Sequence, residues 1–300
     1  MSIRRHSQYK VPPYLPYELK AHSTEIWGRG TVDAKACVAA QTIAVVDLLK
    51  SSSHQIQPGS LSLLFVVGEE VSGDGMLYFS EHKPTNYSAV IFGEPTEGKL
   101  ASGHKGILIF KLHVRGKAAH SGYPWLGVSA NSVMVEALSK LLDLEKNLPS
   151  SEKFGNSTLN IGLVNGGVAA NVVAEVAEAR VAIRIAVGSP DDIKSMITEA
   201  LASTKKRVEY RGGHFEIEFI GRPYGPVDIN ADVKGFDSIT VNYGTDIPNL
   251  DGDHKRYLYG PGSILVAHSD HEHLKISELQ QAVKDYQRLI LAALGSGERL

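Results

Sequence analysis

Five side chains that could bind a metal or move a proton stand at the ends of apolar runs or just before a helix. Glu69 and Glu70 end the run "LLFVVGEE", Glu94 follows "AVIFG", and His268 ends "SILVAH". Asp33 precedes a stretch with helical spacing of apolar residues. In open α/β sheets, ligands bind just beyond the carboxyl ends of the strands. We therefore expect these side chains to meet in space, although they are far apart in the sequence.

Each of these residues also has an ordinary structural interpretation. Asp33 could only cap the helix that follows it, and a Glu-Glu pair is usually part of a solvated loop. Glu94 could be a turn residue, and His268 could be a hydrogen-bonded residue at the edge of the core. Their shared context favours a site, because clustered carboxylates repel one another unless a cation holds them.

Carboxylates together with an imidazole are a ligand set that suits Zn²⁺. Within the adjacent pair, one glutamate would bind the metal and its neighbour would take a proton from water at the metal. The residues therefore predict a metal centre with a neighbouring base.

The composition excludes several other classes of protein. A chain of 300 residues with a formal net charge of -2 offers no electrostatic basis for binding nucleic acid or an anionic membrane. Apolar runs such as residues 61–67 are far shorter than a membrane span. The N-terminal "MSIRRHSQYKVPPY" has no apolar stretch and predicts no secretory signal. Cys37 is the single cysteine, which excludes an intrachain disulfide.

The outer parts of the chain predict an α/β fold. A helix is expected over residues 33–50, where Val38, Ile43, Val46 and Leu49 recur near helical spacing. Buried strands are predicted at residues 60–67, 87–92, 238–244 and 262–268. A final helix follows Ser277 and ends at Gly295. Continuous apolar strands joined by helices indicate a parallel sheet covered on both faces.

The middle of the chain has a different texture. Four segments alternate between apolar and polar residues, as half-exposed strands do: 106–118, 157–167, 174–187 and 214–220. Helices are predicted over residues 129–148 and from Ser189, with Pro190 in its first turn. The order β-α-β-β-α-β describes a small α+β domain. The fold class is thus α/β with an inserted α+β domain, divided at 1–103, 104–220 and 221–300.

Six segments in order carry a family resemblance: "GRGTVDAK", "GEE", "GEPT", "KAAHSGYP", "NGGVAANVV" and "YGPGSILVAH". Together they resemble the co-catalytic zinc metallopeptidases of the aminoacylase, acetylornithine deacetylase and glutamate carboxypeptidase family, in particular its fungal carboxypeptidase branch. The resemblance covers nearly the whole chain from about Val11. It implies a zinc-binding α/β domain interrupted by a lid or dimerisation domain.

The resemblance implies a role for each matched metal-site residue. Asp33 matches the carboxylate that bridges two Zn²⁺ ions, and Glu69 matches the general base. Glu70 and His268 match ligands of one zinc, whereas Glu94 matches a ligand of the other.

The resemblance also implies residues that contact the substrate. His120 matches a histidine that polarises the scissile carbonyl, often from the partner subunit of a homodimer. Asn171 and Arg184 match lid positions that contact substrate in relatives, and Gly262 matches a loop that lines the substrate site.

The chain departs from the family pattern near its start. The family carries His-x-Asp-x-Val-Pro at a strand end, but the histidine position holds Ser7 and the aspartate position holds Tyr9. His6 is one residue off, and a one-residue offset on a strand turns a side chain to the opposite face. We expect an N-terminally incomplete or degenerate chain in which the second zinc site keeps only Asp33 and Glu94.

The expected function is zinc-dependent cleavage of an amide bond at a peptide C-terminus or in an N-acyl amino acid. The alternative is a non-catalytic relative that binds a ligand or dimerises, since the first histidine motif is missing. The sequons at Asn86 and Asn156, with the resemblance, favour a secreted glycoprotein; a cytoplasmic location is the alternative.

Overall fold

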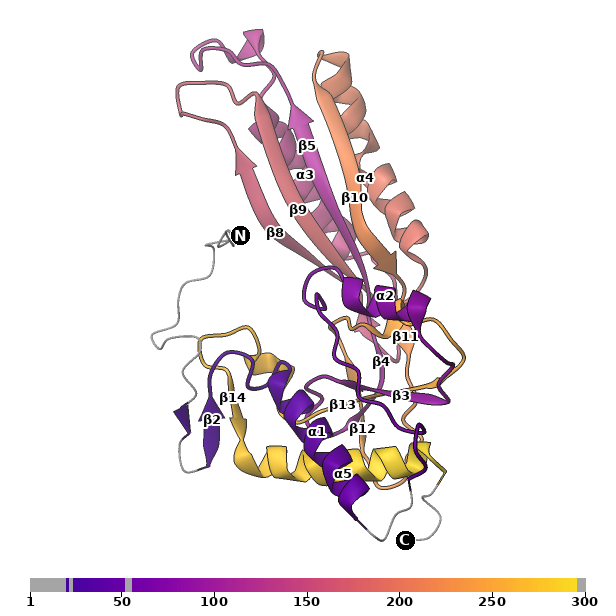
Figure 1. The fold of residues 1–300 in the computed structure, drawn as a ribbon. Coiled ribbons are helices and arrows are strands. Elements are labelled where there is room, and N and C mark those ends of the chain that lie inside the picture. Colours follow the sequence, from indigo (N-terminus) through magenta and orange to yellow (C-terminus); the bar gives the residue numbers. More distant parts are fainter. Residues whose placement is uncertain (1–19, 22–23, 52–55, 296–300) are drawn as a thin grey trace. The chain divides into compact units, whose positions relative to one another are not determined.

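The computed structural model describes residues 20–21, 24–51 and 56–295, and its chain forms two compact units. Unit 1 comprises the described residues of Met1–Ser102, Ile229–Ile239 and Thr245–Leu300. Unit 2 comprises Gly103–Asp228 and Thr240–Gly244. The chain therefore leaves unit 1, builds unit 2 and returns (Figure 1). This arrangement confirms the predicted class of an α/β domain with an inserted α+β domain.

Unit 2 is an antiparallel sheet with two helices packed on one face (Figure 1). The strand order is β10-β5-β9-β8, and the elements are β5 (Gly106–Arg115), α3 (Ala130–Glu145), β8 (Thr158–Gly166), β9 (Val176–Ile185), α4 (Pro190–Tyr210) and β10 (His214–Tyr224). Leu108, Phe110 and Leu112 are fully buried from alternate positions of β5, as the period-2 pattern predicts. The helix α4 starts at the expected Ser189, which forms a capping box with Asp192.

Short elements complete unit 2 and the strands around it. They are η1 (Pro124–Leu126), the hairpin of β6 (Ser150–Ser151) and β7 (Gly155–Asn156), and a three-stranded sheet of β11 (Val227–Asp228), β4 (Leu100–His104) and β12 (Ser238–Val241).

Unit 1 is built around a helix pair and a parallel ladder. The helices α1 (Lys35–Lys50) and α5 (Ile276–Ala293) pack on each other, and β3 (Ala89–Gly93) pairs in parallel with β13 (Lys255–Tyr259). The remaining elements are β1 (Lys20–Ala21), β2 (Glu25–Trp27), α2 (Asp74–His82), η2 (Ile247–Asn249), η3 (Ile264–Val266) and β14 (His273–Lys275). No helix in the part of the chain that the structure describes is long and apolar enough to cross a membrane.

The strand predicted at residues 60–67 is wrong. This segment has no regular structure, and Phe65 and Val67 are 59% and 77% exposed. None of the described strands pairs with it. A strand is stabilised by its ladder partner, so an apolar run without one remains irregular.

The strand predicted at residues 262–268 is also wrong. Residues Ile264–Val266 form a single 3₁₀ turn, and Leu265 is 82% exposed. The strand lies earlier, as β13, where Lys255 aligns with Ala89 and Tyr259 with Gly93. The Pro-Gly turn that follows β13 ends the ladder before the apolar run begins.

The helix α1 buries a different face from the one its largest residues indicate. Val38, Ile43, Val46 and Leu49 are 39–61% exposed. The buried face carries mainly small side chains, namely Ala36, Cys37, Ala40, Ala44, Val45 and Leu48. Small residues let two helices approach closely, and α5 occupies that side of α1.

Candidate metal centre

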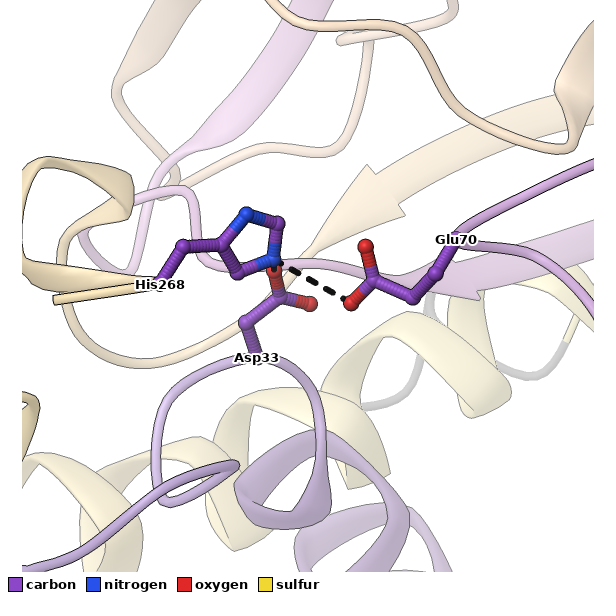
Figure 2. A group of neighbouring side chains, drawn as sticks. All are labelled: Asp33, Glu70 and His268. Atoms are coloured by element: carbon purple, nitrogen blue, oxygen red, sulfur yellow. Dashed lines mark hydrogen bonds and ion pairs between the residues drawn. The ribbon is translucent and has the colours of Figure 1, made fainter. Parts of the chain in front are cut away.

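Asp33, Glu70 and His268 meet at one point of unit 1 (Figure 2). The His268 Nε2 atom lies 3.0 Å from Asp33 Oδ2 and 3.2 Å from Glu70 Oε1. One ligand atom from each residue lies within 4.8 Å of the other two. The Asp33 side chain is only 10% exposed, whereas the Glu70 and His268 side chains are 56% and 58% exposed. The cluster is therefore buried on its Asp33 side and accessible from the other.

Asp33 is held in a tight loop that leads into α1. The Thr31 amide donates to the Gly28 carbonyl at 3.1 Å, and the Lys35 amide donates to the Gly30 carbonyl at 3.0 Å. Val32 is fully buried and packs with Ala36 and Leu274. The apolar anchor at Val32 places the next residue, Asp33, at the margin of the core.

The two adjacent glutamates lie on a turn that leads into α2. The amides of Val71, Ser72 and Gly73 all donate to the Gly68 carbonyl, at 3.2, 3.0 and 2.8 Å. Gly73 has φ +70, and a Cβ atom there would lie 2.8 Å from Asp246 Oδ1. Glycine is needed at this position because the backbone is left-handed and a neighbouring carboxylate packs against it.

The carboxylates of this region shift one another's protonation. Burial raises the pKa of Glu69 to about 7, and the negative charges of Asp246, Glu70 and Asp33 add to the shift. Burial, followed by the charge of Glu70, also raises the pKa of Asp33. Burial, followed by the charges of Glu69 and Asp33, raises the pKa of Glu94 well above its usual range. Without a cation, the site therefore retains protons that an ordinary carboxyl cluster would have lost.

These residues fit a bound Zn²⁺ ion. Two carboxylates and an imidazole offer three ligand atoms of the kinds that zinc binds, and a cation would offset the repulsion that, after burial, raises the pKa values of these acids. Glu94 directly follows β3 and is coupled electrostatically to Asp33, so these two are the described candidates for a second ion. Ser7, Tyr9 and His6 lie outside the described residues.

His120 and Asn171 lie together in unit 2, in the segments that precede α3 and β9. His120 pairs with Val172 in an isolated bridge, and the Ser121 amide donates to the Asn171 carbonyl at 3.0 Å. The Gly122 amide donates to His120 Nδ1 at 3.1 Å. Because Nδ1 accepts this bond, the neutral ring carries its proton on Nε2, which is then the donor toward a ligand.

Arg184 lies at the far end of the same sheet from His120. It pairs with Ile107 and Thr158 near the end of β9, whereas the His120 bridge at Val172 precedes the strand's first residue, Val176. The chain from Val176 to Arg184 rises by about 27 Å at about 3.4 Å per residue. Unit 2 therefore does not bring Arg184 together with His120.

The remaining predicted positions have distinct surroundings. Gly262 has φ +75, and a Cβ atom there would lie 2.8 Å from Leu274 Cδ1 and 3.2 Å from Val32 Cγ2. Gly262 therefore packs against Val32, the residue that precedes Asp33. Asn86 and Asn156, the two sequon asparagines, are both exposed.

Two buried carboxylates whose charges act on Asp33 and Glu69 escaped the analysis of the sequence. Asp246 is 5% exposed, accepts a bond from Asn249 at 2.9 Å, and its Oδ2 atom has no hydrogen bond from the described residues. Glu272 is 1% exposed and accepts bonds from the amides of Val32 and Asp33. The position of Glu272, four residues after His268, could have indicated that it belongs to the site. Nothing in the sequence around Asp246 indicates the same.

Comparison with known proteins places these features in a family context. Residues 102–209 match the family of M20 peptidase dimerisation domains. A probable carboxypeptidase of Uncinocarpus reesii is 49% identical over an alignment of 319 positions, which spans 96% of this chain and 70% of the relative.

Solved structures of low sequence identity share the fold. A tripeptidase of Staphylococcus aureus has a TM-score of 0.72 at 20% identity, covering 94% of this chain and 78% of its own. An M20 metallo-carboxypeptidase of Sulfolobus solfataricus has a TM-score of 0.68 at 17% identity, covering 94% and 80%.

Proposed function

Because the chain belongs to the M20 peptidase family, we propose that it is a zinc-dependent enzyme that cleaves the amide bond of a peptide C-terminus or an N-acyl amino acid. The family makes it a carboxypeptidase-like hydrolase. The observation that carries the finer proposal is the cluster of Asp33, Glu70 and His268, with the raised pKa of Glu69 beside it.

Asp33, Glu70 and His268 would hold one zinc ion, and Asp33 with Glu94 would hold a second more weakly. Zinc bound there supplies a Lewis acid that polarises the substrate carbonyl and makes water more acidic. The protein contributes the ligand charges and the buried surroundings of Asp33, in which those charges act more strongly than in water.

Glu69 is the residue that moves the proton. Its carboxylate accepts a proton from the attacking water and passes it to the amine that leaves. A pKa near 7 suits this exchange, because the group must accept and release a proton near neutral pH.

His120 would donate its Nε2 proton to the oxygen of the reacting carbonyl, as a positioned donor does for a developing oxyanion. Arg184 would bind the substrate carboxylate, and Asn171 would contact the substrate beside His120. One small substrate cannot reach both His120 and Arg184 of a single unit 2, since about 27 Å of strand separates their regions. We therefore propose a homodimer in which the two residues acting on one substrate come from different copies.

We also propose that the protein is a secreted glycoprotein. The exposure of Asn86 and Asn156 supports this location, because both asparagines are accessible to a glycan.

Hydrolysis of a panel of N-acyl amino acids and C-terminal dipeptides tests the proposal. The zinc-loaded protein should show turnover that a chelator removes and zinc restores. His268→Ala should lose turnover and tight zinc, whereas the matched control His271→Ala, an exposed imidazole three residues away, should retain both. Tight binding of a substrate analogue by the zinc-loaded protein without any turnover would instead support the non-catalytic alternative.

A further inference from the structure

Glu272 is a buried carboxylate whose hydrogen bonds go to the loop that carries Asp33. Its Oε1 atom accepts from the Val32 amide at 3.0 Å and from the Asp33 amide at 3.3 Å. Its own main-chain carbonyl accepts from the Gly28 amide at 3.1 Å. One residue thus binds both ends of the 28–33 loop, once through its backbone and twice through its side chain.

The same residue belongs to the segment that carries His268. Directly after Glu272, β14 pairs with β2, with His273 opposite Trp27. Trp27 and His273 also stack, with ring centroids 4.3 Å apart. The ligand-bearing segments of Asp33 and His268 are therefore joined on one side by a strand ladder and on the other by the Glu272 side chain.

The buried position of the Glu272 carboxylate requires compensating interactions. Burying an ionised group costs free energy unless it is paired and hydrogen-bonded. The second oxygen, Oε2, accepts no hydrogen bond from the described residues, and the Arg29 guanidinium lies 3.6 Å from it. At 1% exposure the carboxylate is therefore held by the two amides at Oε1 and by the Arg29 charge near Oε2, and an apolar side chain of similar size would offer the amides no acceptor.

We propose that Glu272 is a positioning residue that locks the backbone of Asp33 at a fixed distance from His268 and so preorganises the metal site. This inference rests on the proposed metal-dependent function of the same cluster. Because the Asp33 amide is held, the backbone that carries its carboxylate keeps its place when the cation is absent. The site then binds metal without first ordering the loop, which strengthens binding.

Three substitutions separate the hydrogen bonds of Glu272 from its charge. Glu272→Gln keeps an acceptor oxygen for the two amides and removes the charge. Glu272→Asp keeps the charge but shortens the side chain by one methylene, and Glu272→Ala removes both. Asp285→Asn is a matched control, because Asp285 is a carboxylate of unit 1 that is 6% exposed and bonds to Tyr259 instead of the 28–33 loop.

The first measurement is zinc affinity of the full chain by competition with a chromophoric chelator. Glu272→Ala and Glu272→Asp should lose about 10- to 100-fold, the usual loss when a residue that orients a metal ligand is removed. Glu272→Gln should remain within a few-fold of the wild type, as should Asp285→Asn. An equal loss in Glu272→Gln and Glu272→Ala would show that charge alone matters, and no loss in Glu272→Ala would remove any positioning role.

The second measurement is amide hydrogen exchange of the metal-free protein, which does not depend on metal binding. The Val32 and Asp33 amides should exchange at least about 10-fold faster in Glu272→Asp than in Glu272→Gln. The Gly28 amide, bonded to the Glu272 backbone, should change little and serves as the internal control. If the wild type bound no metal, the proposed function would fail while this exchange pattern still decided the role of Glu272. Unchanged exchange at Val32 and Asp33 would overturn the inference even in a protein that binds zinc.

Discussion

Replacing Glu69 with glutamine should stabilise the metal-free protein at high pH, although it removes the proposed base. The folded-state pKa of Glu69 is about 7, compared with its ordinary value of 4.5. Since the shift is upward, the fold favours the protonated form. The associated stability is fully present below pH 4.5 and is lost as the pH rises from about 4.5 to about 7.

The size of the effect follows from the shift. A difference of about 2.5 pKa units corresponds to about 3 kcal/mol at 1.36 kcal/mol per unit. At pH 8 the ionised Glu69 should therefore lower the free energy of unfolding by up to about 3 kcal/mol, and Glu69→Gln should restore that amount. At pH 4 the variant and the wild type should differ by less than about 0.5 kcal/mol, because both side chains are then neutral.

The assay is urea denaturation in the presence of a chelator, with tryptophan fluorescence as the probe. The chain has two tryptophans, Trp27 in unit 1 and Trp125 in unit 2. A Trp125→Phe background therefore makes the signal report on the unit that contains Glu69. Glu81→Gln, an exposed substitution on α2 of the same unit, is the matched control and should change stability by less than about 0.5 kcal/mol at either pH. A Glu69→Gln variant that is destabilised at pH 8, or equally affected at both pH values, would refute the reasoning about burial and charge crowding.

Other predictions concern the metal, the donor from unit 2, the surface and the backbone. Zinc titration should give one tight equivalent and a second weaker by more than about 100-fold, because the loss of a ligand costs more than the loss of its orienting partner; two similar sites would contradict this. His120→Ala should lower kcat about 10² to 10³-fold and leave zinc content unchanged, as measured by metal analysis. Endoglycosidase treatment of secreted protein should shift its mobility, with Asn86→Gln and Asn156→Gln each removing one step. Gly262→Ala should lower the free energy of unfolding by more than about 1 kcal/mol, because φ is +75 and the new methyl would press on Leu274.

The fold of unit 2 was largely predictable because its sequence patterns act locally. The alternation in β5 places every second residue in the core, and the Ser189-Pro190 start of α4 matches its cap. In both cases the residues that specify the element lie within it. Such patterns need no knowledge of distant parts of the chain.

The errors in unit 1 arose where pairing partners decide the structure. β13 begins with the charged residues Lys255 and Arg256, so its sequence does not have the apolar pattern expected of a buried strand. It is nevertheless a strand, because it lies in register beside β3. Residues 60–67 have the stronger strand pattern, but no described strand pairs with them. Strand propensity measures how well side chains fit a sheet that already exists, and it does not show which ladder will form.

The candidate metal ligands could be predicted from the sequence, but the buried carboxylates that contact their loops could not. Asp33, Glu70 and His268 were identified from residue type and from their position beside expected elements, and the structure brings them together although neither strand expected at 60–67 or 262–268 forms. Glu272 and Asp246 depend on burial and on hydrogen bonds to backbone amides or to a neighbouring side chain. The spacing from His268 points to Glu272 but not to its partners, because Val32 and Asp33 lie 240 and 239 residues earlier in the chain, and the local bond of Asp246 to Asn249 does not show that Asp246 is buried.

Adjacent glutamates can share one site because the turn that carries them gives each a different environment. Glu70 is 56% exposed and reaches the imidazole of His268 at 3.2 Å, where it is placed to bind a cation. Glu69 is the more buried neighbour and feels the charge of Asp246 most strongly among the surrounding acids, which with burial raises its pKa to about 7. Two chemically identical side chains one residue apart thus lie in different surroundings, Glu69 partly buried among other acids and Glu70 56% exposed beside His268. The roles proposed above, metal binding for Glu70 and proton transfer for Glu69, fit these two environments, and that of Glu69 depends on the charge of the buried Asp246 as well as on its own burial.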